Sequence, residues 1–328
     1  MCRTGNFKGK TVIMWLICVL ACISLWGVTS ILYKKGANKE DNLIHYKFSI
    51  SVGIICLIIA IIFLIIRDEE ISIFESAIRI WPMTLFGIIY AIGTTYTFKG
   101  YVYNDASIEA PIENTANGFC LIILIAVFAV LGNADSIWEI LSPFEMVGII
   151  CIFLGLLLIS VIQHKESKAQ GKNRLFRSGA SALVFPIIYS MMDGLETILT
   201  GVCFDQNFGY AMPVDDSVII IGFEYGFFAL SFWIYVSVKE KHIFNPFTKS
   251  NVPFVSGAVC DNVALVLYAN AMASNAVATD PILAIYPVIT IILSKILLKE
   301  KLSVKQYLSL ALMLFGSVFI VLGENVWF

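Results

Sequence analysis

The sequence predicts an all-α integral membrane protein, with ten transmembrane helices arranged as two inverted five-helix repeats. Three observations predict this fold class. Of the 328 residues, 59% are hydrophobic and only 14% are charged, whereas about a quarter of the residues in ordinary soluble proteins are charged. Long apolar runs fall into two sets of five, and the second set weakly matches the first. Because each half has an odd number of crossings, the second half must enter the bilayer in the opposite sense, as in secondary transporters.

Each apolar run is long enough to cross a hydrocarbon core of roughly 30 Å, which takes about 20 helical residues. Backbone polar groups must be satisfied internally in lipid, and the runs do not alternate in polarity, so we expect helices rather than strands. The first run follows Arg3, Lys8 and Lys10, but its apolar core is too long for a signal peptide. The expected spans are 11–33, 47–66, 78–102, 107–131, 143–162, 179–200, 217–238, 252–272, 276–298 and 304–323.

An internal match relates the third and fourth spans to the eighth and ninth. When residue 257 is placed under residue 87, the Ala-Pro-Ile step at 110–112 falls on the Asp-Pro-Ile step at 280–282. Both regions have an apolar helix, a short polar elbow and a helix that opens near a proline, which the first turn tolerates. We therefore divide the chain into a first repeat, a basic linker and a second repeat, over residues 1–162, 163–178 and 179–328.

The run 278–323 resembles the closing part of an EamA-type repeat in the drug/metabolite transporter superfamily. In that part, Tyr286-Pro287 lies in the centre of one helix, Lys299-Glu300-Lys301 follows a leucine-rich stretch, and Gly316 lies in the final helix. The resemblance implies ten helices and a role in metabolite transport.

The first half carries a weaker form of the same resemblance. The run 108–132 is the counterpart of the closing part, and Leu-Trp-Gly at 25–27 is similar to the family's first-helix signature. The sequence departs from the pattern at Asn117, because the mirrored position in the second half is Pro287. It departs again in the number of acidic residues within its spans.

These acidic residues mark the candidate site. A carboxylate at the centre of a bilayer costs roughly 2.5–3.5 kcal/mol on insertion scales, so such residues usually face a cavity. Tyr189, Asp193 and Glu196 share one face of the sixth span. Consecutive helices are antiparallel, so Asp193, Glu224 of the seventh span and Asp261 of the eighth fall at similar depth. We therefore expect an acidic cluster at the centre of the membrane.

Aromatic side chains accompany the acids on the same helix faces, and carboxylates with aromatic rings suit an ammonium group. A carboxyl group in a low-dielectric cavity also holds a proton more tightly than in water, which suits proton exchange near neutral pH. The alternative for each acid is a hydrogen bond between helices. The expected substrate- or proton-binding residues are Asp193, Glu196, Asp261, Asn262, Glu224, Tyr189, Tyr268 and Trp26, with Glu113, Asn117 and Tyr225 as further candidates.

Other functional classes lack their motifs. The three histidines lie in separate loops, and no cysteine pair has metal-site spacing with them. No HExxH motif or Ser-His arrangement is present, and the loops are too short for a soluble domain. We expect no catalytic residue, no metal and no cofactor. The net charge of −2 gives no reason to expect a nucleic-acid partner.

The leading hypothesis is a secondary active transporter of a small amine-bearing metabolite, such as an amino acid, a polyamine or a choline-like compound, with protons as a coupling partner. One alternative is a neutral or sugar-type cargo, with the buried acids used for coupling or packing. A second is a membrane sensor or scaffold on a transporter fold that no longer transports. The absence of Asn-x-Ser/Thr sequons favours a bacterial cell membrane.

Two features bear on orientation and assembly. Lys and Arg gather in the loops opposite the termini, which would place both termini outside the cell. The family is usually drawn with both termini in the cytoplasm, so orientation stays open. Gly148, Gly155, Gly316 and Gly323 recur at seven-residue spacing, which favours close helix contacts within the repeat or between the protomers of a homodimer.

Overall fold

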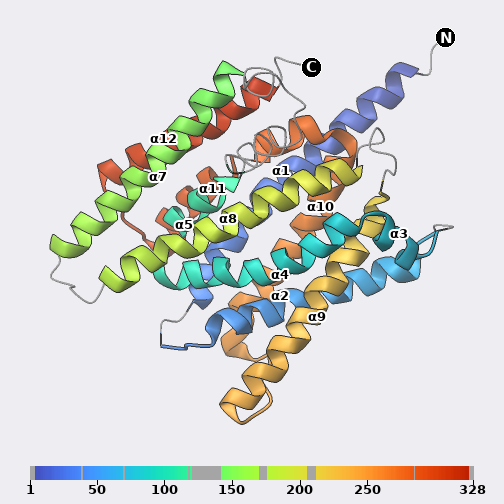
Figure 1. Cartoon of the computed structure of the whole chain (residues 1–328), viewed down its shortest axis with the longest axis horizontal. Coiled ribbons are helices and arrows are strands. Elements are labelled where there is room, and N and C mark those ends of the chain that lie inside the picture. The colour runs from blue at the N-terminus through green and yellow to red at the C-terminus, as the bar shows by residue number, and fades with distance from the viewer. Residues whose placement is uncertain are drawn as a thin grey trace.

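The computed structural model describes residues 4–37, 40–68, 71–116, 119, 142–169, 176–204, 212–283 and 285–324. Within these residues the chain is helical and contains no strand. The first half contains α1 (Thr4–Gly36), α2 (Ile44–Ile66), α3 (Ile73–Arg79), α4 (Trp81–Tyr103), α5 (Ala106–Glu113) and α7 (Pro143–Ala169) (Figure 1). The second half contains α8 (Phe176–Phe204), α9 (Val214–Glu240), α10 (Val252–Leu283), α11 (Tyr286–Leu293) and α12 (Val304–Glu324). A short 3-10 turn, η4 (Lys249–Asn251), precedes α10, and a π-helical turn, η5 (Ser294–Leu298), continues α11.

The helices have the length and surface of a multi-pass membrane protein. Five of those described are long and apolar enough to cross a membrane, and the bent pair α3–α4 makes a sixth if it counts as one span. Their outer faces carry large apolar side chains, such as Ile65 at 77% exposure and Phe227 at 66%. Exposed apolar surface on this scale belongs in lipid rather than in water. The ten-helix count remains a prediction.

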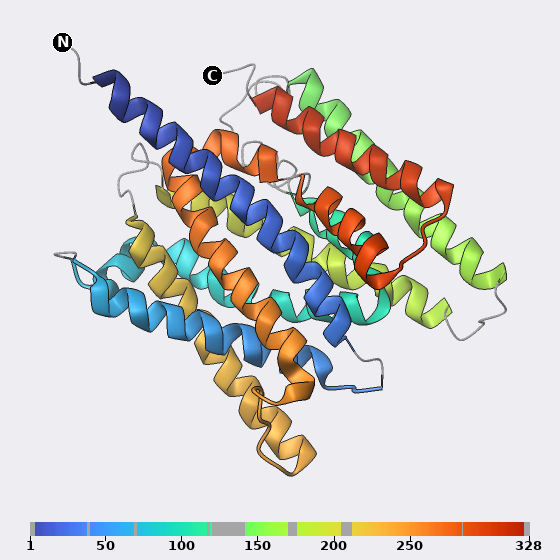
Figure 2. The same cartoon turned by 180° about the vertical axis from the view of Figure 1, so that it is seen from behind.

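Helices from the two halves pack side by side across the bundle. α2 lies against α9, α1 against α10, α4 against α8, and α7 against α12 (Figures 1 and 2). The α7–α12 contact depends on glycine: a Cβ added at Gly316 would lie 2.7 Å from the carbonyl oxygen of Gly148. The seven-residue spacing predicted a close helix contact, but this contact joins the two repeats rather than lying within one of them. Small residues at this crossing let the two backbones touch.

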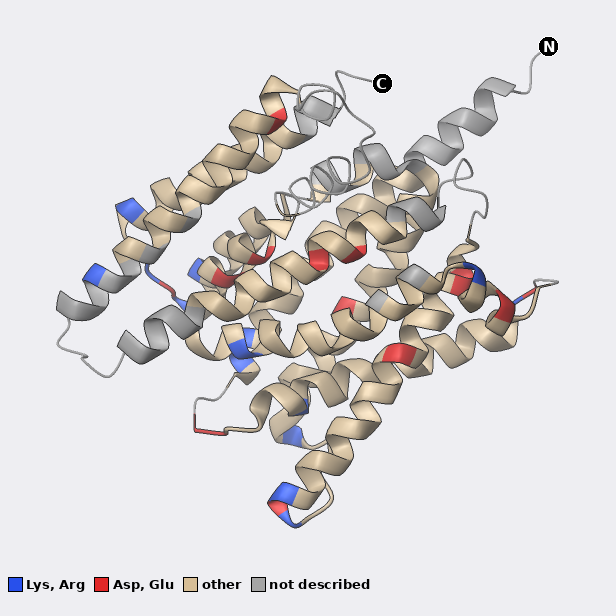
Figure 3. Ribbon diagram, in the orientation of Figure 1, with Lys and Arg blue, Asp and Glu red and all other residues tan. Residues whose placement is uncertain are grey.

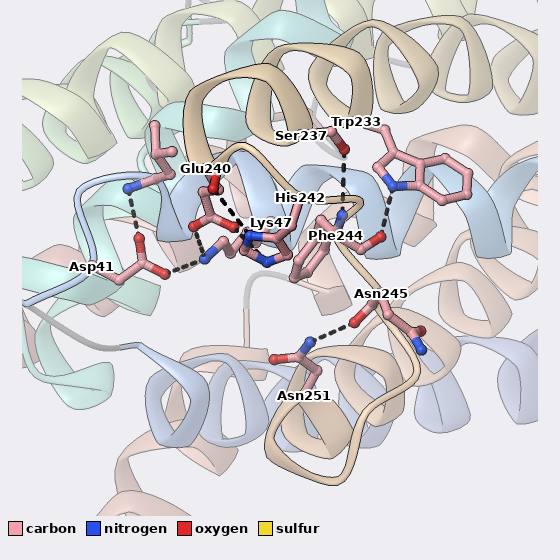
Figure 4. A network of polar contacts seen from close by, with 10 residues as sticks. Asp41, Lys47, Trp233, Ser237, Glu240, His242, Phe244, Asn245 and Asn251 are labelled. Atoms are coloured by element: carbon pink, nitrogen blue, oxygen red, sulfur yellow. Dashed lines mark hydrogen bonds and ion pairs between the residues drawn. The ribbon is translucent and has the colours of Figure 1, made fainter.

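The two ends of the bundle differ in charge. One end, called here the Lys-rich end, carries the last turns of α1 and α9 and the first turns of α2 and α12, with Lys34, Lys47, Lys239 and Lys305 (Figure 3). There Lys47 at the start of α2 forms ion pairs with Asp41 at 2.7 Å and with Glu240 at the end of α9 at 2.5 Å (Figure 4). The opposite end holds both chain termini and a buried ion pair between Arg67 and Asp216.

Two predicted span boundaries are wrong. The third expected span, 78–102, is broken at Ile80, where the axes of α3 and α4 differ by 97°. Pro82 lies in the first turn of α4, where its missing N–H favours a new helix start. In the second half, α10 continues to Leu283 through the expected elbow at 273–275, because the alanine-rich stretch there favours helix. The break comes later, just before Tyr286-Pro287. Residues 120–131 of the fourth expected span lie outside the described residues.

Candidate functional site

A cavity of about 190 Å³ lies between helices of both halves. α1 and α4 from the first half, and α8, α9 and α10 from the second, supply most of its lining. Every candidate residue predicted from the sequence lines this cavity except Asn117, which lies outside the described residues: Trp26, Glu113, Tyr189, Asp193, Glu196, Glu224, Tyr225, Asp261, Asn262 and Tyr268.

The lining has one sign of charge. Five carboxylic acids line the cavity, at positions 113, 193, 196, 224 and 261. No Lys, Arg or His is among the described residues that line it. An ammonium group or a proton would balance these acids, whereas an anionic ligand would find no cationic partner in the described lining.

The face of α8 meets tyrosines of α4 and α9. The hydroxyls of Tyr189 and Tyr90 lie 2.8 Å apart, and both side chains lie beside the carboxyl group of Asp193. One turn further along α8, the Thr200 hydroxyl donates to Glu196 Oε1 at 2.5 Å. The ring of Tyr225 lies edge-on to that of Tyr90, with centroids 6.3 Å apart. This side of the cavity therefore combines two carboxyl groups with aromatic hydroxyls.

Asp261 forms a second acidic position within an aromatic group from α1, α10 and α11. The Tyr33 hydroxyl donates to Asp261 Oδ2 at 2.8 Å. The Trp26 ring lies 5.7 Å from that of Tyr268 and 5.9 Å from that of Tyr286. All three rings line the cavity, and the face of an aromatic ring attracts a cationic group.

Asn262 has a different environment, although it lines the same cavity. Its amide nitrogen donates to the Ala258 carbonyl at 2.8 Å and to the Val52 carbonyl of α2 at 3.3 Å. The first bond lies within α10, and the second joins α10 to α2.

Glu224 is the carboxyl group with the fewest partners in the lining. Its side chain is 8% exposed, and Oε1 has no hydrogen-bond partner within the described part of the chain. The carboxyl group occupies the space beside Gly87 of α4, where an added Cβ would overlap Oε2. A buried polar atom without a partner costs free energy, and a bound cation or proton would remove that cost.

Glu113 enters the cavity from α5. Its Oε2 accepts a hydrogen bond from the Tyr101 hydroxyl at 3.1 Å, while Oε1 has no partner among the residues described. One turn earlier on α5, Glu109 is completely buried and lies behind the cavity lining.

The sequence reasoning missed several tyrosines of this site. The cavity is also lined by Tyr33, Tyr90, Tyr101 and Tyr286. None of these tyrosines shares a helix face with an acidic residue of the cavity. Their acidic or tyrosine partners lie on other helices, so no local spacing could have identified them. Tyr286 was noted only as part of the resemblance, and its hydroxyl donates to the Ala110 carbonyl at 3.2 Å.

The cavity ends at an aromatic cluster before it reaches the Lys-rich end. Tyr33, Phe48, Phe98, Tyr101 and Phe254 are each at most 3% exposed and pack ring against ring. Beyond this cluster, Lys34 donates to the Tyr101 carbonyl at 3.0 Å and to the carbonyl of Asn104. The buried rings, followed by the polar contacts of Lys34, therefore lie between the cavity and the Lys-rich end.

Comparison with known proteins finds a family match over about a third of the chain. Residues 210–322, which run from α9 into α12, match the EamA-like transporter family, and this confirms the resemblance seen in the sequence. A solved crystal structure of a protein is similar over 96% of this chain and 98% of its own, with a TM-score of 0.57 and 11% identity. At that identity the likeness shows a shared fold alone. No curated protein matches the chain.

Proposed function

We propose that this chain, whose residues 210–322 belong to the EamA-like transporter family, is a ten-helix secondary transporter of a small cationic or zwitterionic amine in a bacterial cell membrane. The observation that carries the proposal is the cavity lining, with five carboxylic acids and no basic side chain among its described residues. Members of this family are transporters and not typically enzymes. The acids and aromatic rings of the cavity suit the binding of a ligand.

The ammonium group of the substrate would lie among the acids of α8, α9 and α10, where charge-assisted hydrogen bonds replace its hydration. Glu224 has an unpartnered oxygen ready to accept such a bond. The rings of Trp26, Tyr268 and Tyr286 would contact the apolar part of the substrate or a methylated ammonium. An amino acid, a polyamine and a choline-like compound share this chemistry.

The packing of the helices supports the inverted repeat. If the first to fifth spans of one half correspond to those of the other, exchanging the halves maps the α2–α9 and α7–α12 contacts onto themselves. It also maps the α1–α10 contact onto the α4–α8 contact, and both contacts are present. A substrate site where the halves meet is the arrangement expected for transporters built from inverted repeats.

A neutral, hydroxyl-rich cargo is the second candidate. The hydrogen bond from Thr200 to Glu196 and the bond from Tyr33 to Asp261 show that two of the acids already have donors within the protein. In that case the carboxyl groups would serve coupling or packing, and sugars rather than amines would bind. A sensor that has lost transport would still bind its ligand, so a transport measurement and not binding alone separates it from a carrier.

Thermal unfolding of the detergent-purified protein tests the proposal. The probes are putrescine, choline and lysine, compared with glucose and a nucleotide sugar. A ligand at 100 times its dissociation constant stabilises the folded state by about 2.7 kcal/mol, which raises the melting temperature measurably. We expect stabilisation by at least one amine, and loss of this effect in the Asp193→Asn and Asp261→Asn variants.

The matched control is Glu145→Gln. Glu145 is also a buried glutamate, but it bonds with Ser142 at the start of α7, away from the cavity. This variant should keep the response to the amine. Stabilisation by the sugars alone would overturn the amine proposal in favour of the second candidate. If both aspartate variants still respond to the amine, Asp193 and Asp261 are not part of the amine site.

A further inference from the structure

A second acidic feature lies on α5, on the side of the cavity that faces the Lys-rich end. Glu109 and Glu113 are one helical turn apart on the same face of this helix. Their side chains are 0% and 7% exposed, and each has an Oε1 atom with no hydrogen-bond partner in the described residues. Their other oxygens accept from α4 and from the residue that ends it: Glu113 from Tyr101 at 3.1 Å, and Glu109 from Asn104 at 2.6 Å.

The two glutamates differ in access. Glu113 lines the cavity, whereas Glu109 does not and lies one turn nearer to the Lys-rich end. The carboxyl group of Glu109 fills the space left by the missing side chain of Gly100, where an added Cβ would overlap Oε1. No room remains there for an amine or a hydrated metal ion, so the ligand that fits the free oxygen of Glu109 is a proton.

Charged and titratable groups surround the pair on several elements. Lys34 of α1 interacts with Glu109, and Asp105 at the start of α5 lies 3.9 Å from Lys34. Glu300, before α12, uses both carboxylate oxygens to accept from the Ala106 and Ser107 backbone at 3.0 and 3.1 Å, so its charge is held by the start of α5. The other titratable neighbours of the pair include Tyr101 of α4, Tyr189 and Asp193 of α8, Asp261 of α10 and Tyr286 of α11.

We propose that Glu113 and Glu109 form a two-position proton site that links the cavity with the Lys-rich end, and that this site couples proton movement to transport. Glu113 takes up a proton at Oε1 from the cavity and becomes neutral; passing this proton to Glu109 restores the Glu113 carboxylate and neutralises Glu109. Release of the proton from Glu109 to water at the Lys-rich end, where the Asp105 side chain is 51% exposed, returns the pair to its starting state. The coupling role rests on the proposed function, because coupling needs a transported amine. The proton path on α5 is separate from the acids of α8, α9 and α10 that are proposed to bind the amine.

Infrared spectroscopy of the purified protein tests the proton site without any substrate. A carboxyl group that holds a proton in the membrane interior gives a carbonyl band that a carboxylate does not. We expect a pH change to alter this band in the wild type, and the Glu109→Gln and Glu113→Gln variants each to remove part of the change. The control Glu145→Gln should leave it intact, since the carboxylate of Glu145 accepts from the backbone of Ser142. A difference spectrum that is unchanged in both α5 variants would overturn the proton site.

Transport in proteoliposomes tests the coupling role, with putrescine as the probe. In the wild type, an imposed pH gradient should drive putrescine above its equilibrium level. Glu109→Gln should lose this accumulation but keep putrescine counterflow, which needs only binding and exchange, at a rate close to that of the wild type. Should Glu109→Gln fail to fold, Glu113→Gln should also lose the accumulation, because the two positions act in series. Thermal stabilisation by putrescine then separates loss of the proton path from loss of binding, because Glu113 also lines the cavity.

The outcomes separate this inference from the proposed function. Wild-type protein that shows no putrescine binding or counterflow would count against the amine cargo, while the infrared measurement would still decide the proton site. Gradient-driven accumulation that survives in both α5 variants would overturn the coupling role, even though amine transport itself stands.

Discussion

Gly87 and Glu224 show how one residue of α4 sets the position of a carboxyl group on α9. Glu224 is buried and presents an unpartnered oxygen, and it can do so only because position 87 has no side chain. The backbone of Gly87 is ordinary helix, so the glycine is required for space and not for its conformational freedom. The same relation exists between Gly100 and Glu109, so two of the three described buried glutamates with an unpartnered oxygen lie opposite glycines.

Gly87→Ala should therefore displace the Glu224 carboxyl group. Overpacking of this kind costs about 1–3 kcal/mol, and the displaced group should no longer accept a bond from an ammonium ligand. We expect a lower melting temperature and a weaker response to the amine probe. The double variant Gly87→Ala with Glu224→Ser removes the clash, so it should regain stability without regaining amine binding. If the single variant binds the amine as the wild type does, Glu224 is not part of the amine site.

At the scale of elements, α2 and α9 are joined by ion pairs at both of their ends. At the end with the chain termini, Arg67 Nε lies 2.6 Å and Nη2 lies 3.0 Å from the Asp216 carboxylate, with side chains 9% and 0% exposed. At the Lys-rich end, Lys47 and Glu240 are more open, at 13% and 20% exposure. The planar guanidinium of Arg67 matches the carboxylate with two bonds, so the first pair should contribute more to holding the helices together.

Asp216→Asn tests this difference. Removing one partner of a buried pair leaves an uncompensated charge and costs about 3–5 kcal/mol. Replacing Glu240 should cost less, because Lys47 is partly open to solvent and keeps Asp41 as a second partner. We expect Asp216→Asn to lower the melting temperature in detergent strongly and Glu240→Gln to change it little. Replacing both residues, as in Arg67→Met with Asp216→Leu, should recover most of the loss. Equal effects of the two single variants would contradict the expected difference between the pairs.

The elements also show which parts of the structure the sequence could predict. Spans such as 47–66 were readable because a membrane helix leaves a continuous apolar run, and the acidic face of α8 was readable because helical spacing is local. The bend at Ile80 and the continuation of α10 through residues 273–275 were not, because an apolar run shows that a span is present but not where one helix ends and the next begins. In the site, Asp261 was predicted but its donor Tyr33 was not, because 228 residues separate them in sequence.

At the scale of the whole molecule, the charge on the two ends is unequal. Most of the described lysines gather at one end (Figure 3). The end with the chain termini carries Lys8 and Lys10 in the first turns of α1, and Arg67 and Arg79, which are paired with Asp216 and Glu75. Lys and Arg in short loops remain on the cytoplasmic side during insertion. The proton site inferred on α5 would then open toward the cytoplasm, and the ion pairs of Lys47 would lie on the cytoplasmic surface.

We therefore expect both termini to lie outside the cytoplasm, against the usual depiction of the family. Alkaline phosphatase fused after Phe328 should be active in a bacterial host, because it folds only after export, and green fluorescent protein at the same position should be dark. The two reporters control for one another, since a change in expression alone would lower both signals. A fluorescent fusion with an inactive phosphatase would reverse the assignment: the Lys-rich end would face outward, and the α5 site would then exchange protons with the outside of the cell.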